Sequence, residues 1–106
     1  MPTVKETFDG MAGRFRADKA AGVNATIQYD ITGDHGGTWH AVIKDGKCTV
    51  SPGGASSPTL TVSMSSQDWL DMVGGKLKGE TAFMTGKLKL KGDMGLAMKI
   101  GGMFQT

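Results

Sequence analysis

Few residues of this chain are of types that perform catalysis. It contains two histidines, His35 and His40, and a single cysteine, Cys48. The strand patterns described below place His35 in a turn, His40 on a polar sheet face and Cys48 on an apolar one. A Cys/His nucleophilic pair needs both side chains within hydrogen-bond reach, and these positions do not allow it. A metal site needs clustered ligands, which the sequence also lacks. We therefore expect no metal and no enzyme activity.

Phosphate-binding loops are missing too. A P-loop requires GxxxxGK followed by Ser or Thr. Lysine follows glycine at three places, Gly46-Lys47, Gly75-Lys76 and Gly86-Lys87, but cysteine or leucine comes next and the upstream glycine is absent. The dinucleotide pattern GxGxxG does not occur either. We expect no nucleotide cofactor.

The most regular charge pattern lies in residues 86–92, where three lysines alternate with two leucines. The lysines are Lys87, Lys89 and Lys91. Strict alternation predicts a strand with one cationic and one apolar face. The cationic face has two explanations: a solvated surface that discourages edge-to-edge pairing, or contact with lipid headgroup phosphates.

Charge is spread unevenly over a chain of net charge +2. Residues 1–75 carry six basic and eight acidic residues, giving −2, whereas residues 76–106 carry six lysines and two acids, giving +4. This bias is too weak for a dedicated nucleic-acid binder, which also needs aromatic stacking positions. It favours transient contact with an anionic membrane.

Residues 93–104 have a helical pattern and are apolar on almost every side. A stripe at i, i+4 and i+8 predicts packing on a sheet, and it consists of Leu96, Ile100 and Phe104. Three further methionines lie outside that stripe: Met94, Met98 and Met103. Methionine suits adaptable binding surfaces. A loosely held, methionine-rich helix is therefore predicted to form a lid over a cavity.

The preceding elements follow from local patterns. Thr3 and Glu6 form a capping box, so a helix is predicted from there to a point before Gly22. Its buried face would consist of Val4, Phe8, Met11, Ala12 and Phe15. Alternation predicts strands over 25–32, 38–44 and 60–64, with a second helix from Ser65 to Gly74.

Asp45-Gly46 fits a two-residue hairpin turn, because both positions tolerate positive φ. The resulting register predicts an apolar face made of Trp39, Ala41, Ile43, Cys48 and Val50. The opposite face would carry His40, Val42, Lys44, Lys47, Thr49 and Ser51.

Together these elements predict one α+β domain over residues 1–106, with a mainly antiparallel five-stranded sheet whose apolar face is covered by helices. The single cysteine fits a reducing compartment. No signal-peptide pattern and no segment of membrane-spanning length is seen. A cytoplasmic monomer is expected.

Three segments resemble the sterol carrier protein type-2 family of non-specific lipid-transfer domains: residues 39–46, residues 60–69, and residues 75–77 with 82–93. The last is the most specific, and the resemblance extends from about Val4 to Phe104. It implies an apolar tunnel for fatty acids, acyl-CoA esters, sterols or related lipids, and no catalysis. On this sequence the tunnel wall would map to Trp69, Met72, Val73, Phe83, Met84, Met94, Leu96, Met98, Met103 and Phe104.

The expected function is lipid binding or transfer without a cofactor, the ligand lying between the sheet and the C-terminal helix. The alternative is a non-catalytic scaffold whose apolar C-terminal helix docks a lipid- or quinone-metabolising enzyme.

Overall fold

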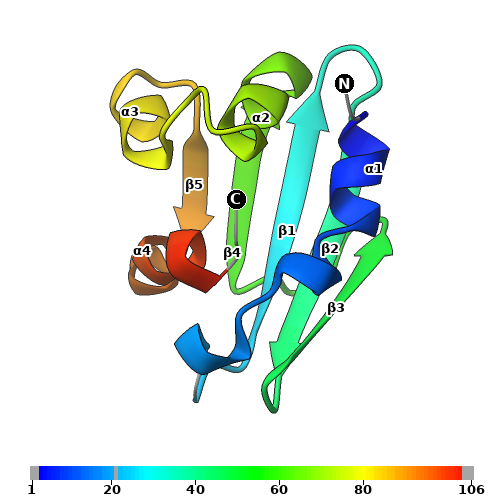
Figure 1. Cartoon of the computed structure of the whole chain (residues 1–106), viewed down its shortest axis with the longest axis vertical. Helices are drawn as coiled ribbons and strands as arrows, with labels where there is room; N and C mark the ends of the chain where they lie inside the picture. Colours follow the sequence, from blue (N-terminus) through cyan, green and yellow to red (C-terminus); the bar gives the residue numbers. More distant parts are fainter. Residues whose placement is uncertain (1–2, 21, 104–106) are drawn as a thin grey trace.

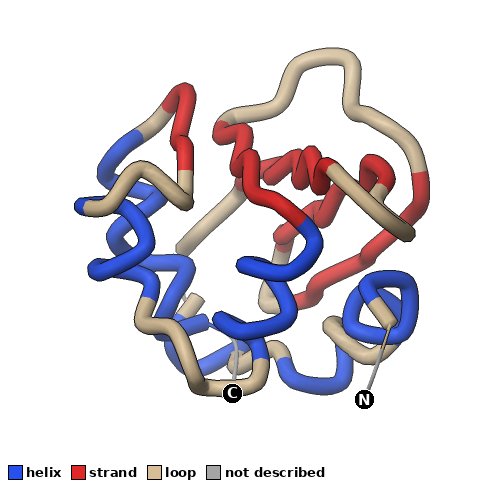
Figure 2. Tube along the Cα trace, turned by 90° about the horizontal axis from the view of Figure 1, so that it is seen from above, coloured by secondary structure: helices blue, strands red, loops and turns tan. Residues whose placement is uncertain are grey.

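The computed structural model describes residues 3–20 and 22–103, which form a five-stranded sheet with helices on one side (Figures 1 and 2). The strands are β1 Ala25–Thr32, β2 Gly37–Lys44, β3 Lys47–Pro52, β4 Leu60–Ser65 and β5 Lys89–Gly92. The helices are α1 Val4–Asp9, α2 Ser66–Val73, α3 Gly79–Met84 and α4 Met94–Met103, with two 3₁₀ turns, η1 Ala12–Arg14 and η2 Ala17–Lys19. None of these helices is long and apolar enough to cross a membrane.

The strand order is β3-β2-β1-β4-β5. Only β1 and β4 run parallel, and the other three neighbouring pairs are antiparallel. The parallel pair arises because the chain leaves β3 at one edge and crosses to the far side of β1 before it forms β4. The predicted α+β class with a mainly antiparallel five-stranded sheet is therefore confirmed.

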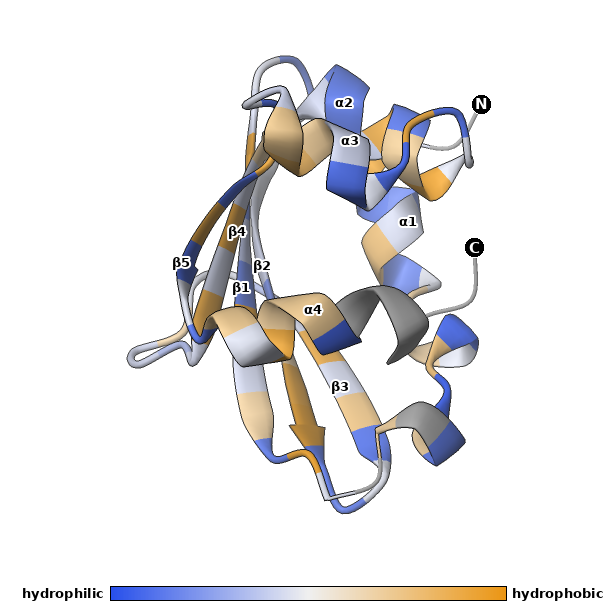
Figure 3. Ribbon diagram, turned by 90° about the vertical axis from the view of Figure 1, so that its left-hand side faces the viewer, coloured by the Kyte–Doolittle hydropathy of each residue, from blue (hydrophilic) through white to orange (hydrophobic). Residues whose placement is uncertain are grey.

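One face of the sheet holds the core and meets the helices, as Figure 3 shows in profile. Its alternating buried residues come from the three central strands: Ile27, Tyr29, Ile31, Ala41, Ile43, Leu60, Val62 and Met64. The intervening positions are mostly polar and lie on the opposite face. This period of two is the pattern from which the strands were predicted.

The β2–β3 hairpin has the predicted register. Ile43 lies opposite Cys48, and Lys44 lies opposite Lys47. Asp45 has φ 52° and Gly46 has φ 74°, as a two-residue turn of this type requires. Cys48 packs partly buried against the core, so the prediction that it faces the helices is confirmed.

The N-terminal helix is shorter than predicted. The capping box is present, since the Glu6 N–H donates to Thr3 Oγ1 at 3.2 Å and the Thr3 N–H donates to Glu6 Oε1 at 3.1 Å. The α-helix nevertheless ends at Asp9, and two 3₁₀ turns replace its predicted continuation. The two glycines at positions 10 and 13 weaken a helix there. As a result Ala12 is exposed, contrary to the prediction.

An aromatic cluster joins α1 to α2 and the sheet. The ring of Phe8 stacks on Trp39 at 4.5 Å and on Trp69 at 4.8 Å between centroids. The Trp69 Nε1–H donates to Thr7 Oγ1 at 2.8 Å, and the Thr7 hydroxyl donates to the Val4 carbonyl at 2.6 Å. Thr7 is buried, so its hydroxyl satisfies an indole N–H that water does not reach.

Replacing Thr7 with valine is expected to lower the free energy of unfolding by about 1–3 kcal/mol, because the shape is kept while the buried indole N–H loses its acceptor. Urea denaturation measures the change. Thr7→Ser keeps the hydroxyl and serves as the control, with a smaller loss expected. Equal losses in the two variants would contradict the assigned role of this hydrogen bond.

The second half contains one helix that was not predicted, α3, and a strand shorter than predicted. The alternating pattern starts at residue 86, yet β5 begins only at Lys89. The reason is that the N–H groups of Lys87 and Leu88 donate to the Ala82 carbonyl, at 2.9 and 3.0 Å, and so complete the end of α3. They are therefore not available to pair with β4.

Candidate functional site

The side chains with catalytic potential lie apart. His40 Nδ1 lies 2.8 Å from the Gly53 carbonyl oxygen, and His35 lies in an exposed turn. Cys48 is half-buried against the core on the other face of the sheet from His40. Within residues 3–20 and 22–103, no group of three or more His, Cys, Asp or Glu side chains is arranged to hold a metal ion.

Burial raises the pKa of the Cys48 thiol from 9.0 to about 11, and burial also raises the pKa of Tyr29. In the unfolded chain both groups release their protons at lower pH than in the folded one. We therefore expect the free energy of unfolding to fall as pH rises from about 9 to about 11. Urea midpoints across this range measure it, and Cys48→Ala should flatten part of the decline. A urea midpoint of the parent protein that does not change over this pH range would contradict the expectation.

The residues predicted to line a tunnel fall into three groups by exposure. Trp69 and Leu96 are buried, and Met72 and Val73 are partly buried against the core. Four are exposed on α3 and α4: Phe83 (48%), Met84 (85%), Met94 (45%) and Met98 (88%). The side chain of Met103 and the whole of Phe104 lie outside the described residues.

We call the four exposed side chains Phe83, Met84, Met94 and Met98 the α3–α4 apolar surface. Among the described residues only one other large apolar side chain is exposed, Val42 on the opposite face of the sheet. These exposed side chains thus lie on α3 and α4, the helices at the two ends of β5. Exposed large apolar side chains beyond the scattered few of an ordinary surface are candidates for a binding surface.

β5 links the two helices and lies between them (Figure 1). On its helix-facing side Leu90 lies opposite the buried Val62 of β4, and both Leu88 and Leu90 are only partly buried. These two leucines and the partly buried side chains of α2 provide further apolar contact beside the α3–α4 apolar surface. The alternating pattern predicts that these two leucines lie on the apolar face of the strand. They were not among the predicted site residues.

Gly92 fixes the start of α4. Its φ is +116°, and a Cβ at this position would overlap the carbonyl oxygen of Thr59. The next residue, Asp93, donates its N–H to the same Thr59 oxygen at 3.0 Å, and its Oδ1 accepts from the Leu96 N–H at 3.1 Å. This sharp turn directs α4 back across the helix side of the sheet. The sequence alone gave no signal for this role of Gly92.

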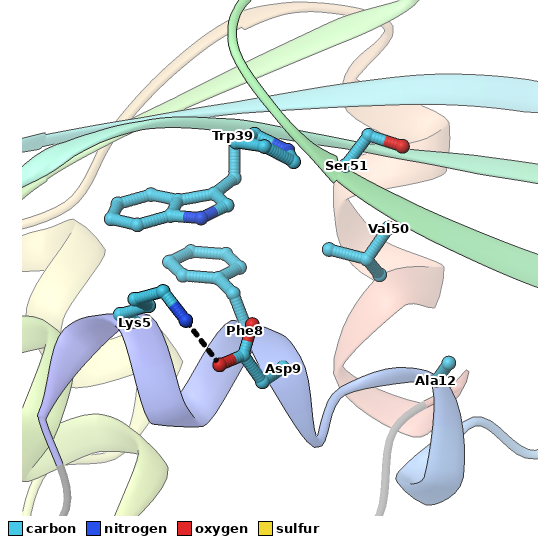
Figure 4. Close-up of a pocket in the computed structure, with 8 residues that line it drawn as sticks. Lys5, Phe8, Asp9, Ala12, Trp39, Val50 and Ser51 are labelled. Atoms are coloured by element: carbon cyan, nitrogen blue, oxygen red, sulfur yellow. Dashed lines mark hydrogen bonds and ion pairs between the residues drawn. The ribbon is translucent and has the colours of Figure 1, made fainter.

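Two pockets of the structure lie elsewhere. One of about 270 Å³ lies between α1 and the β2–β3 hairpin, with Phe8, Trp39 and Val50 in its wall and the Lys5–Asp9 ion pair (2.9 Å) beside it (Figure 4). Another of about 220 Å³ lies near Val42 at the far end of β1 and β2. Neither is lined by a residue of the predicted tunnel wall. In this structure four of the predicted wall residues are exposed. That the wall residues enclose a tunnel stays a prediction.

The chain matches the model of the SCP-2 sterol transfer family over residues 11–105. It is 37% identical over 98 residues to hydroxysteroid dehydrogenase-like protein 2 of Xenopus tropicalis, covering 92% of this chain but 24% of that protein. The chain thus spans about a quarter of the length of the first curated relatives that it matches.

Solved structures share the fold. The palmitated SCP2L2 of Aedes aegypti, solved by NMR, is 29% identical with a TM-score of 0.77, covering 93% of this chain and 91% of that one. The sec-alkylsulfatase Pisa1 from Pseudomonas sp. is 26% identical with a TM-score of 0.80, covering 99% of this chain and 17% of that one. Because the family model spans most of the chain and the fold agrees, this protein belongs to the SCP-2 sterol transfer family.

Proposed function

We propose that this protein is a non-catalytic lipid carrier that holds one apolar ligand between its sheet and α4. The observation that carries the proposal is the α3–α4 apolar surface, which exposes four large apolar side chains on the two helices that flank β5. A folded domain gains by covering such a surface, and an acyl chain or a sterol can cover it.

The wall of the site would combine this surface with Trp69, Met72, Val73, Leu96, Met103 and Phe104. The helix α4 serves as the movable part. Among the described elements it packs chiefly on β4, β5 and η2, and of the side chains that are described on it Leu96 alone is fully buried. Over residues 94–99, where the side chains are described, one buried anchor holds α4, and we infer that this part can move at modest cost to admit a ligand.

Apolar contact alone supplies enough free energy for binding. Burying a methylene contributes about 0.8 kcal/mol, so an acyl chain of about 16 carbons has a gross driving force of about 13 kcal/mol. The costs of association and ordering take a large part of it, and micromolar affinity remains attainable. Such a site would accept fatty acids, acyl-CoA esters, sterols or isoprenoid lipids without strict selection. The structural neighbour solved in palmitated form supports an acyl ligand.

A second candidate is an accessory module that docks a lipid- or quinone-metabolising enzyme through α4. It is favoured by the relatives named hydroxysteroid dehydrogenase-like protein 2, of which a segment like this chain makes up about a quarter. Presentation of a bound lipid to an enzyme would combine both candidates. The carrier proposal takes the protein to be a cytoplasmic monomer, as expected from the sequence.

Native mass spectrometry of the purified protein, followed by organic extraction, tests the carrier proposal against the scaffold. A monomer with a lipid adduct, released as an acyl or isoprenoid compound on extraction, is the expected result. A stable complex or dimer free of lipid, together with failure to take up added fatty acid, would contradict the carrier and favour the scaffold.

A further inference from the structure

The methionines of this chain differ sharply in exposure. Of the six whose side chains are described, Met11 and Met64 lie in the core, 4% and 3% exposed, and Met72 is partly buried against it. Met84 and Met98, by contrast, are 85% and 88% exposed. The remaining one, Met94, is 45% exposed. A dissolved oxidant therefore reaches the sulfur atoms of Met84 and Met98 more readily than those in the core.

The fold does not require methionine at these two most exposed positions. Met84 ends α3 and Met98 lies within α4, and leucine has about the same helix propensity as methionine. Neither side chain belongs to the core or to the apolar side chains packed against it. What methionine adds at such a position is a thioether that can be oxidised reversibly.

The lysines of the alternating segment leave these methionines uncovered. Lys89 and Lys91 lie opposite Ser63 and Thr61, which places them on the sheet face away from the helices. Lys87 lies exposed just before β5. The α3–α4 apolar surface is therefore open to small solutes as well as to an apolar ligand.

The single cysteine of the chain is a poor competitor for the same oxidants. Cys48 is half-buried, and burial raises the pKa of its thiol to about 11. At neutral pH the thiol therefore stays protonated, and the protonated form reacts slowly because the thiolate is the nucleophile. Oxidation of the folded protein by a peroxide should thus occur first at the exposed methionines.

We propose that Met84 and Met98 are sites of reversible oxidation by a peroxide, and that their oxidation weakens lipid binding at the α3–α4 apolar surface. The thioether sulfur attacks one oxygen of hydrogen peroxide, the O–O bond breaks, and the products are a sulfoxide and water. The sulfur loses two electrons and the peroxide gains them. The inference rests on the proposed lipid carriage, because the effect on binding requires a ligand at this surface.

The change in polarity explains the loss of binding. A sulfoxide oxygen is a hydrogen-bond acceptor, and an acyl chain or a sterol that covered it would leave it without a partner. In the ligand-free protein the same oxygen faces water, so the fold should tolerate it. A methionine sulfoxide reductase reverses the step: the sulfoxide becomes the thioether and water while a dithiol is oxidised to a disulfide.

Peptide mapping by mass spectrometry after a limited dose of hydrogen peroxide tests the assignment of the sites. Met84 and Met98 are expected to gain one oxygen each before Met11 or Met64 does, and the urea midpoint should stay unchanged at that dose. Oxidation of the core methionines at the same rate, or unfolding that accompanies the first oxidation, would overturn the assignment.

Titration with a fluorescent fatty acid before and after the same dose tests the effect on binding. The affinity of the parent should fall by at least about five-fold, and it should recover after treatment with both epimer-specific sulfoxide reductases and dithiothreitol. The matched variant is Met84→Leu/Met98→Leu, compared with itself before and after peroxide. Its affinity should not change with the treatment, whereas Cys48→Ala should respond as the parent does.

The two measurements distinguish this inference from the carrier proposal. If the parent takes up no fatty acid, the carrier proposal fails and the effect on binding fails with it, while the peptide map still decides whether the two sites are oxidised first. If the parent takes up fatty acid and both sulfoxides form without loss of affinity, the carrier stands and the oxidative control is overturned. An equal loss in Met84→Leu/Met98→Leu would overturn it as well.

Discussion

A chain that ends at Asp93 is expected to lose fatty acid binding altogether and to unfold at a lower denaturant concentration. The deleted segment contains α4, which would supply Met94, Leu96 and Met98 to the site. It also removes the buried Leu96, which is 6% exposed. Truncating a core leucine costs about 2–5 kcal/mol, so the deletion should cost at least that much. Urea denaturation and titration with a fluorescent fatty acid measure the two losses.

Because the truncated chain loses binding and stability together, a point substitution must separate them. Met98 is 88% exposed, so Met98→Glu should change the free energy of unfolding by no more than about 0.5 kcal/mol. The introduced carboxylate would lie against the apolar ligand and should weaken fatty acid binding by more than about ten-fold, because a carboxylate is costly to desolvate. A large loss of stability in Met98→Glu would show that this side chain packs as ordinary core.

Replacing Gly92 with alanine is the second change for which we expect a large effect. The residue has a positive φ, and the added Cβ would overlap the Thr59 carbonyl oxygen, a backbone atom that no side-chain rotation can move. Strain of this kind costs about 1–3 kcal/mol, and relief by moving β5 away from β4 would also displace α4. We therefore expect Gly92→Ala to lower the urea midpoint and to weaken fatty acid binding at the same time.

Gly13→Ala is the matched control for Gly92→Ala. A Cβ at Gly13 has open space around it, with no atom within 4 Å, and the position has no positive φ. Stability should stay the same or rise by up to about 1 kcal/mol, and fatty acid binding should be unchanged. Equal effects of the two substitutions would contradict the role assigned to the β5–α4 turn.

The fold could be predicted largely because its patterns are local. The alternation over residues 25–32 and the Asp45-Gly46 turn specify strands, faces and register within a few residues of each other. The Thr3 capping box likewise marked the start of α1. The start of the last strand was predicted wrongly because two neighbouring segments compete for the same N–H groups. The start of β5 is set by Ala82, whose carbonyl takes the two N–H groups that would otherwise extend the strand.

The sequence indicates where apolar residues exceed the needs of a one-sided core, and it does not indicate the shape of a site. The excess of apolar residues in α4 predicted a surface beyond what a one-sided core requires, and the exposure of Met94 and Met98 agrees with that excess. Whether α4 lies against the sheet or stands off it depends on contacts far apart in the sequence, such as Gly92 against Thr59. Periodicity carries no information on such contacts.

Titration of the protein with a fluorescent fatty acid, with unlabelled palmitate as competitor, tests the central claim most directly. The account predicts saturable binding of one molecule per chain in the micromolar range, abolished by competitor and strongly reduced in Met98→Glu. Val42→Glu, which places the same charge at the exposed apolar residue of the opposite sheet face, should bind as the parent does. No saturable binding at micromolar protein, or equal losses in the two variants, would contradict a lipid site at α4.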